Sequence, residues 1–186
     1  METVAHTGPA PSKWVCRWSH LIGPGARLLD VACGSGRHVR WAAERGCKVT
    51  AVDRDAAALA ALRPIADVLE ADLENRPWPL DGARFDAVLC TNYLWRPLLP
   101  AIVDSVAEGG VLLYETFGID QAGIGRPSNP EFLLRPGELL RAVPGLRVLG
   151  YEEGFLAAPD RYVQRIAAVR ERTATASGER WALPSA

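Results

Sequence analysis

The sequence predicts an α/β fold: a doubly wound, mostly parallel sheet of seven strands, with helices on both faces and an antiparallel hairpin at its C-terminal end. Three observations carry this prediction. Runs of nearly continuous apolar residues at 27–33 and 85–91 are typical of strands covered on both faces. Segments with helical periodicity separate such runs, which favours parallel strands joined by right-handed crossovers. A glycine-rich turn at 33–36 links the first strand directly to a helix.

The N-terminal half alternates between strands and helices after a short opening segment. Residues 1–11 contain Gly8, Pro9 and Pro11 and indicate a loose arm. Ser12 is suited to cap a short helix whose apolar stripe includes Trp14 and Trp18. Beyond the GPGA break, we expect strands at 27–33, 48–53 and 67–72 and helices at 37–45 and 56–65.

The C-terminal half continues this alternation and then changes. We expect a strand at 85–91, a helix at 98–107, a strand at 111–116, a helix at 138–143 and strands at 146–154 and 161–171. The last two strands follow one another closely and predict the hairpin. Residues 118–137 are rich in Gly and Pro and predict a long loop, which is usually functional in a compact domain. One domain at 12–172 and a tail at 173–186 are the expected boundaries.

Composition excludes several classes of protein. The 186 residues suit one domain, and 21 Lys and Arg against 22 Asp and Glu give no basic footprint for nucleic acid. Because no apolar stretch is long enough to span a bilayer and residues 1–13 do not resemble a signal peptide, we expect a cytoplasmic protein without a membrane partner. Four scattered cysteines, with no CxxC pair, indicate reduced thiols and no metal site.

The strongest functional signal is an acidic residue followed by the glycine turn. Asp30 ends the first strand, and Gly34 and Gly36 open the next helix. A dinucleotide site would need the spacing GxGxxG, but Val39 stands where the last glycine should be. A carboxylate at this strand end disfavours phosphates and favours an ammonium or sulfonium group. The alternative is a turn that only joins the strand to the helix.

The segment DVACGSG resembles the first motif of class I S-adenosylmethionine-dependent methyltransferases, which implies a Rossmann-like fold. Ala32 stands where that family commonly has Gly. The resemblance implies S-adenosyl-L-methionine as cofactor and S-adenosyl-L-homocysteine as product. On this segment it implies a cofactor site at Asp30, Ala32, Cys33, Gly34, Gly36 and His38. For His38, contact with the cofactor carboxylate and a packing role both stay open.

Two further strand ends carry acids that extend this site. Asp53 lies near the offset at which an acidic side chain accepts from ribose hydroxyls, although it could instead cap the helix that starts near Asp55. Asp72 ends the third strand, where the resemblance implies contact with the adenine amino group. The other residues that we expect in the cofactor site are Arg54, Leu73, Thr91 and Asn92.

The acceptor side is less defined. The polar candidates are Tyr93, Glu115, Arg96, Arg126 and Arg135, of which the last two lie in the loop at 118–137. Tyr93 could stack on a planar substrate or pack its loop. The two arginines could orient an anionic acceptor from the loop at 118–137, or could be solvated or pair with Glu131 and Glu138.

The segments ACGSGRH, VDRD, EFLLRPGELL and VLGYEEG together look like those of the small bacterial tellurite-resistance-type methyltransferases. This similarity implies a small-molecule acceptor, with an anion such as a chalcogen oxyanion among the candidates. Methylation of RNA or protein, and an inactive cofactor-binding module, are the alternative functions. The oligomeric state is left open.

Overall fold

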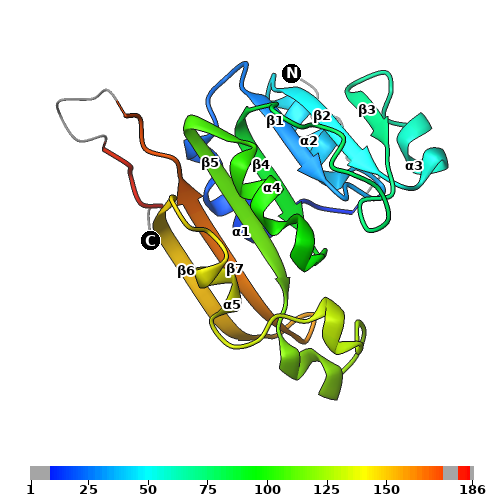
Figure 1. Cartoon of the computed structure of the whole chain (residues 1–186), viewed down its shortest axis with the longest axis vertical. Helices are drawn as coiled ribbons and strands as arrows, with labels where there is room; N and C mark the ends of the chain where they lie inside the picture. The colour runs from blue at the N-terminus through cyan, green and yellow to red at the C-terminus, as the bar shows by residue number, and fades with distance from the viewer. Residues whose placement is uncertain (1–8, 174–179, 185–186) are drawn as a thin grey trace.

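One sheet runs through the whole molecule, in the strand order β3-β2-β1-β4-β5-β7-β6 (Figure 1). The computed structural model describes residues 9–173 and 180–184. The strands of this part are β1 (Arg27–Val31), β2 (Lys48–Asp53), β3 (Asp67–Glu70), β4 (Phe85–Thr91), β5 (Val106–Phe117), β6 (Arg147–Leu156) and β7 (Arg161–Val169). Strands β1 to β5 pair in parallel, whereas β7 pairs antiparallel with both β5 and β6. The predicted seven-stranded sheet and its C-terminal hairpin are confirmed.

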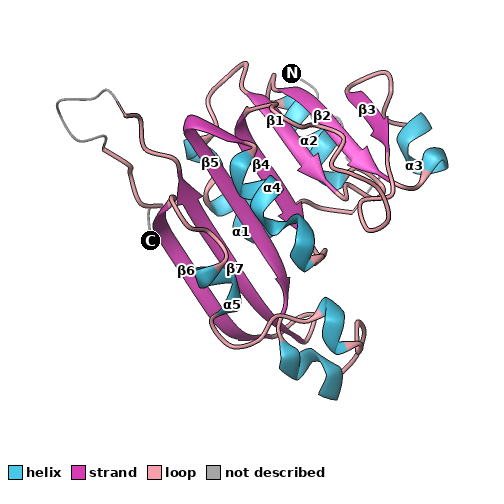
Figure 2. Cartoon of the chain, viewed as in Figure 1, coloured by secondary structure: helices cyan, strands magenta, loops and turns pink. Residues whose placement is uncertain are grey.

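Short helices cover both faces of this sheet (Figure 2). They are α1 (Lys13–Arg17), α2 (Arg37–Glu44), α3 (Ala56–Ala60), α4 (Leu99–Asp104) and α5 (Glu138–Arg141). Successive side chains of β1 point to opposite faces of the sheet. Leu28 belongs to the apolar layer that contains α1, α2 and α3, and Leu29 belongs to the layer that contains α4 and α5. This two-layer core accounts for strands that read as continuous apolar runs.

Two elements differ from the sequence prediction. The helix expected at 56–65 ends at Ala60, and Pro64 disfavours helical geometry at the residue before it. Strand β5 begins at Val106, five residues before the predicted start, because Phe85 donates to the carbonyl of Ser105 and the pairing with β4 starts there. The preceding helix is correspondingly short, and a 3₁₀ turn at Arg96–Leu98 leads into it.

The loop at 118–137 lies beyond the carboxyl end of β5, at the bottom of Figure 1. It contains 3₁₀ turns at Ile119–Gly123 and Pro130–Phe132 and returns to β5 through Leu134, whose N–H donates to the carbonyl of Phe117 at 2.9 Å. Leu133 and Leu134 are fully buried. These leucines fix the far end of the loop to the core.

The chain ends are described in part. Residues 1–8 of the expected arm and 174–179 and 185–186 of the expected tail lie outside the described residues. Within the described part of the tail, Trp181 packs against the apolar layer that contains α1, and the carbonyl of Ala182 lies 2.9 Å from Nε2 of His20. Across residues 9–173 and 180–184, every helix is too short or too polar to cross a membrane.

Candidate functional site

The carboxyl ends of β1, β2 and β3 bring the predicted acids to one edge of the sheet. A cavity of about 260 Å³ opens there, and we call it the acidic cavity because three carboxylates border it. Its lining residues are Ala32, Asp53, Arg54, Ala71, Asp72, Leu73, Glu74 and Tyr93. Five of these were predicted in the cofactor site, and Tyr93, predicted on the acceptor side, lies among them. Ligands of open α/β sheets bind at this edge.

Asp53 holds the glycine turn in place. Its Oδ2 accepts from the N–H of Gly34 at 2.7 Å, and its Oδ1 accepts from the N–H of Asp55 at 3.0 Å. Asp55 itself caps α3, since its side chain accepts from two N–H groups of that helix. The cap expected as an alternative role for Asp53 therefore belongs to Asp55.

The turn uses left-handed backbone at three positions. Ala32, Gly34 and Gly36 have φ of 52°, 53° and 78°. A Cβ on Gly36 would overlap the side chain of Leu62, so both the backbone and the space require glycine there. Ala32 adopts the same left-handed conformation at a cost of roughly 1 kcal/mol. This cost explains why the family that the motif resembles commonly has Gly at this position.

Asp30 and His38 form the buried floor of the site. Asp30 is 1% exposed, and its Oδ2 has no hydrogen-bond partner among the described residues. Burial raises the pKa of Asp30 to about 7, although the nearby Arg37 lowers it. His38 accepts from the N–H of Ser12 at 3.0 Å, and burial together with Arg37 lowers the pKa of His38 to about 3. His38 is therefore neutral and has a packing partner, one of the two roles left open for it.

Two other predicted residues of this region have local partners. Burial raises the pKa of the Cys33 thiol to about 12, with further contributions from the carboxylates of Asp30 and Asp53, so the thiol stays protonated. Asp72 accepts from the N–H of Glu74 at 3.1 Å and from the Asn75 side chain at 2.8 Å, which lowers the pKa of Asp72. Asp72 therefore stays ionised at the cavity wall.

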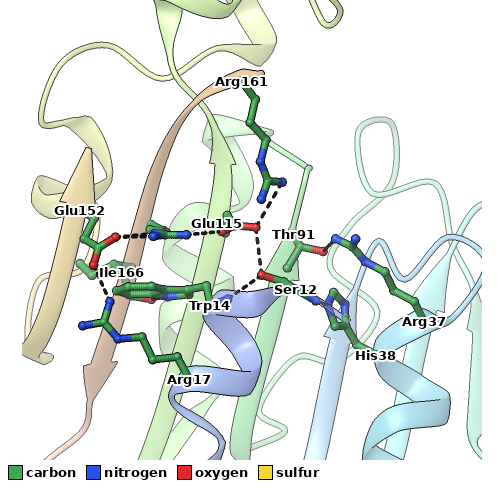
Figure 3. Close-up of polar contacts among 11 residues, drawn as sticks. Ser12, Trp14, Arg17, Arg37, His38, Thr91, Glu115, Glu152, Arg161 and Ile166 are labelled. Atoms are coloured by element: carbon green, nitrogen blue, oxygen red, sulfur yellow. Dashed lines mark hydrogen bonds and ion pairs between the residues drawn. The ribbon is translucent and has the colours of Figure 1, made fainter. Parts of the chain in front are cut away.

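The end of β4 is linked to α2. Arg37 donates to Oγ1 of Thr91 at 3.3 Å (Figure 3). Asn92, with φ of 57°, donates its N–H to the carbonyl of Glu115 at 2.8 Å. The Tyr93 hydroxyl is buried without a partner in the described part of the chain, and burial raises the pKa of Tyr93. A hydroxyl held neutral in this way is a poor general base.

Glu115 is fully buried, and its side chain is held by partners from the start of α1 and from β7. Its Oε1 accepts from Oγ of Ser12 at 3.0 Å, and the guanidinium groups of Arg165 and Arg161 lie 3.4 Å and 3.7 Å from its two oxygens (Figure 3). Arg165 also pairs with Glu152, which in turn pairs with Arg17 at 2.6 Å. Glu115 thus joins the N-terminal helix to the hairpin.

A second cavity lies over this network, with a volume of about 350 Å³. Five cationic side chains line it, and we call it the cationic cavity: Lys13, Arg17, Arg37, Arg161 and Arg165. The apolar wall includes Trp14, whose ring lies 4.9 Å from the guanidinium carbon of Arg165. Sequence reasoning missed this cavity. The available signal was a pair of arginines four residues apart, which places both on one face of β7.

The loop arginines lie elsewhere. Arg126 and Arg135 are exposed and line neither cavity. Glu138, considered as a partner of the loop arginines, forms its ion pair with Arg96 instead, at 2.6 Å from Nε of Arg96. The other guanidinium nitrogens of Arg96 donate to two carbonyls of the loop. Arg96 therefore fastens the loop at 118–137 to the end of β4.

The comparisons with known proteins agree with the fold and with the glycine turn. Residues 28–110 match the family described as methyltransferase domain. The chain is 38% identical to ubiquinone biosynthesis O-methyltransferase of Alkalilimnicola ehrlichii, over 61% of this chain and 58% of that protein. It is 36% identical to malonyl-[acyl-carrier protein] O-methyltransferase of Enterobacter lignolyticus, over 51% of this chain and 40% of that protein. The chain thus spans about half the length of these curated relatives.

The likeness to solved structures covers a larger share of the chain. TehB from Haemophilus influenzae superimposes with a TM-score of 0.66 at 21% identity, covering 85% of this chain and 61% of that one. At this identity the superposition shows the fold. The resemblance to class I methyltransferases that was inferred from the sequence is confirmed.

Proposed function

We propose that the chain is an S-adenosylmethionine-dependent methyltransferase that transfers the methyl group to a small anionic molecule. The observation that carries the proposal is a pair of cavities: one is bordered by carboxylates, and the other is lined by five cationic side chains, among them Arg37, which donates to Thr91 at the end of β4. The match of residues 28–110 to methyltransferase domains supports the activity. The acidic cavity would take the adenosine end of the cofactor, and the cationic cavity would take the acceptor.

The residues of the acidic cavity suit a cofactor that carries positive charge and hydroxyl groups. Asp53 offers carboxylate oxygens at the end of β2, and Leu73 offers an apolar surface beside Asp72. The unpartnered Oδ2 of Asp30 would accept from the cofactor's amino group. A pyrophosphate would meet three carboxylates and one guanidinium, that of Arg54, in this cavity, which supports S-adenosylmethionine over a dinucleotide.

Methyl transfer from a sulfonium needs little acid or base chemistry. The acceptor atom attacks the methyl carbon in line, the carbon–sulfur bond breaks, and a neutral thioether leaves. An oxyanion is already deprotonated, so alignment and exclusion of water suffice. Both curated relatives are named as O-methyltransferases, which supports an oxygen nucleophile.

The cationic cavity supports an anionic acceptor. Glu115 and Glu152 offset part of the charge of its five cationic side chains, and an excess of positive charge remains. The buried Nε of Arg161 has no partner within the described residues and could donate to an oxyanion. In this arrangement Glu115 does not touch the acceptor but positions Arg161 and Arg165. The loop arginines Arg126 and Arg135 are the alternative anion site.

A binding and transfer experiment tests the function. Calorimetry should detect binding of S-adenosylhomocysteine to the chain and should detect no saturable binding of NADH. Asp53→Ala removes a charged acceptor from the ribose and a partner of Gly34, so its affinity should fall tenfold or more, since hydrogen bonds to charged groups contribute ~1.5–3 kcal/mol each.

Methyl-labelled cofactor should then label small carboxylates or oxyanions, chalcogen oxyanions included, in preference to thiols and bulk RNA. Saturable micromolar binding of NADH, or labelling of RNA alone, would contradict the proposal.

A further inference from the structure

The cationic cavity has an apolar wall as well as its cations. The apolar residues of this wall come from the N-terminal segment and from the turn between β6 and β7, and they are Pro11, Trp14, Leu156, Ala157, Ala158 and Pro159. An inorganic oxyanion carries hydrogen-bond acceptors on every side, and acceptors buried against an apolar wall lose their partners at a cost. The lining of the cavity therefore distinguishes between the anionic acceptors that the proposed function allows.

The volume of the cavity, about 350 Å³, is also larger than a small oxyanion needs. A water molecule occupies roughly 30 Å³ in the liquid, so an oxyanion of four or five heavy atoms needs about 120–150 Å³ at the same packing. More than half of the cavity would then hold water against apolar side chains. A carboxylate with a hydrocarbon body would fill that space and release the water, which is favourable.

The strand register puts part of the apolar wall directly beside a guanidinium group. Leu156, the last residue of β6, pairs with Arg161, the first residue of β7. Directly opposed residues of antiparallel strands point to the same face of the sheet. Arg165 lies four residues further along β7 and shares this face, which carries its guanidinium to the ring of Trp14 in α1. The face of the hairpin toward α1 thus combines one apolar side chain with two cations.

Of these two arginines, Arg161 has more donors left for a ligand. Its Nη1 lies 3.7 Å from Oε1 of Glu115, beyond hydrogen-bond distance, and its Nε has no partner within the described residues (Figure 3). Arg165, in contrast, donates to Glu152 at 2.8 Å and to Glu115 at 3.4 Å. An anion that binds Arg161 would bring the rest of its structure next to the strand neighbour of Arg161, which is Leu156.

Resting on the proposed function, we infer that the acceptor is an organic carboxylate with a hydrocarbon body, and that Leu156 selects it over an inorganic oxyanion. The carboxylate binds at Arg161, and the hydrocarbon body contacts Leu156 and the turn that follows it. In the transfer step, one carboxylate oxygen forms a bond to the methyl carbon while the carbon–sulfur bond breaks. The products are a methyl ester and a neutral thioether. Because the ester carries no charge, it loses its attraction to Arg161 and leaves the cavity.

A series of anions tests this inference in the wild-type chain. Acetate, butyrate, hexanoate and selenite are titrated calorimetrically in the presence of saturating S-adenosylhomocysteine. Each methylene buried at the apolar wall should tighten binding by up to roughly fourfold, so hexanoate should bind more than about tenfold more tightly than acetate. Selenite should bind no more tightly than acetate. Equal affinities for the three carboxylates, or tighter binding of selenite than of hexanoate, would overturn the inference.

Two neighbouring replacements, Leu156→Ser and Phe155→Ser, form a matched pair. Phe155 also belongs to β6, but it is exposed, packs on Tyr162 and does not line the cavity. Leu156→Ser should reduce the advantage of hexanoate over acetate by about threefold or more and change the affinity for acetate less than about twofold. Phe155→Ser should leave both affinities unchanged. An equal loss for both carboxylates in Leu156→Ser, or the same selective loss in Phe155→Ser, would contradict the role of Leu156.

If Leu156→Ser does not fold, as judged by its thermal melt, Leu156→Ala takes its place with the same expected result. Transfer is measured separately, with methyl-labelled cofactor. Anions that bind in the expected order but gain no label would refute the proposed function and not the selectivity of the cavity. Labelling of selenite in preference to hexanoate would overturn the inference while the proposed function stands. Absence of binding by all four anions would overturn the inference as well.

Discussion

The acidic and cationic cavities lie at the same sheet edge but are assembled in different ways. The acidic cavity is lined by residues between Ala32 and Tyr93, most of which directly follow consecutive parallel strands. The cationic cavity takes its cations from α1, from the start of α2 and from β7, and α1 and β7 lie more than 140 residues apart in the chain. The acidic cavity is therefore formed by residues close to one another in the sequence, whereas the cationic cavity is formed only by tertiary packing.

This difference determines what the sequence could predict. Asp30, Asp53 and Asp72 follow three strands recognisable from their apolar runs, and parallel strands place their carboxyl ends together. The glycine turn could also be predicted from the sequence, because few structures have an acidic residue and two glycines at this spacing. The sheet edge that carries the acids followed from these residues, and the hairpin followed from the two consecutive strand-like segments at 146–154 and 161–171.

The acceptor side could not be predicted in the same way. The role proposed for Arg161 and Arg165 depends on the strand order. β7 inserts between β5 and β6 and thereby brings these arginines to Glu115 and Glu152. The four-residue spacing of these arginines indicates that they share a face of the strand, but it does not indicate which residues that face contacts. Arg126 and Arg135 were instead suggested by the composition of their loop, and their role in acceptor binding stays a prediction.

The largest expected effect concerns stability at the floor of the acidic cavity. Burial raises the pKa of Asp30 from 3.8 to about 7, so between these values the folded chain binds more protons than the unfolded chain. Its contribution to the free energy of unfolding therefore falls as pH rises through that window. Asp30→Asn removes this cost and should be more stable than wild type at pH 8, by about 1–4 kcal/mol.

Urea unfolding of both proteins at pH 4 and pH 8 measures this effect. His38, whose pKa is lowered from 6.5 to about 3, has the opposite dependence but is present in both proteins. Taking the difference between the proteins cancels its contribution. The stability difference should be small at pH 4 and should grow toward pH 8. A difference that does not change with pH would show that Asp30 is not a buried charge in the folded chain.

The second prediction separates the cationic cavity from the loop as the site of the acceptor. Arg161→Gln removes one guanidinium from the cavity and should raise the KM for an anionic acceptor about tenfold, the weight of one charge-assisted contact. The affinity for S-adenosylhomocysteine should change little, because Arg161 lies away from the acidic cavity. Steady-state kinetics with labelled cofactor provides the measurement.

The matched variant is the double replacement of Arg126 and Arg135 by Gln. If the acceptor binds in the cationic cavity, these exposed arginines can be replaced with the KM unchanged. If the loop binds the acceptor, the double variant raises the KM and Arg161→Gln does not. In that case the acidic cavity would remain the proposed cofactor site, but the cationic cavity would not be the acceptor site.

The smallest expected effect is at Ser12, where local and long-range structure meet. Its Oγ accepts from the N–H of Trp14 at 3.1 Å, as the sequence-predicted cap requires, and also donates to Glu115 at 3.0 Å, which the sequence did not indicate. Loss of an N-cap costs ~0.5–2 kcal/mol. Ser12→Ala should therefore lower stability by about 1 kcal/mol, whereas Ser12→Thr keeps the hydroxyl and should recover most of it.

The kinetics of these Ser12 variants decide whether α1 belongs to the acceptor site. Lys13 and Arg17 reach the cationic cavity only while α1 stays docked, and Ser12 joins α1 to both Glu115 and His38. Removing the hydroxyl should thus raise the acceptor KM a few-fold without changing the affinity for S-adenosylhomocysteine, and Ser12→Thr should restore the KM. A loss of stability with the KM unchanged would make α1 a structural support of the sheet, and the cationic cavity would then depend on α2 and β7 alone.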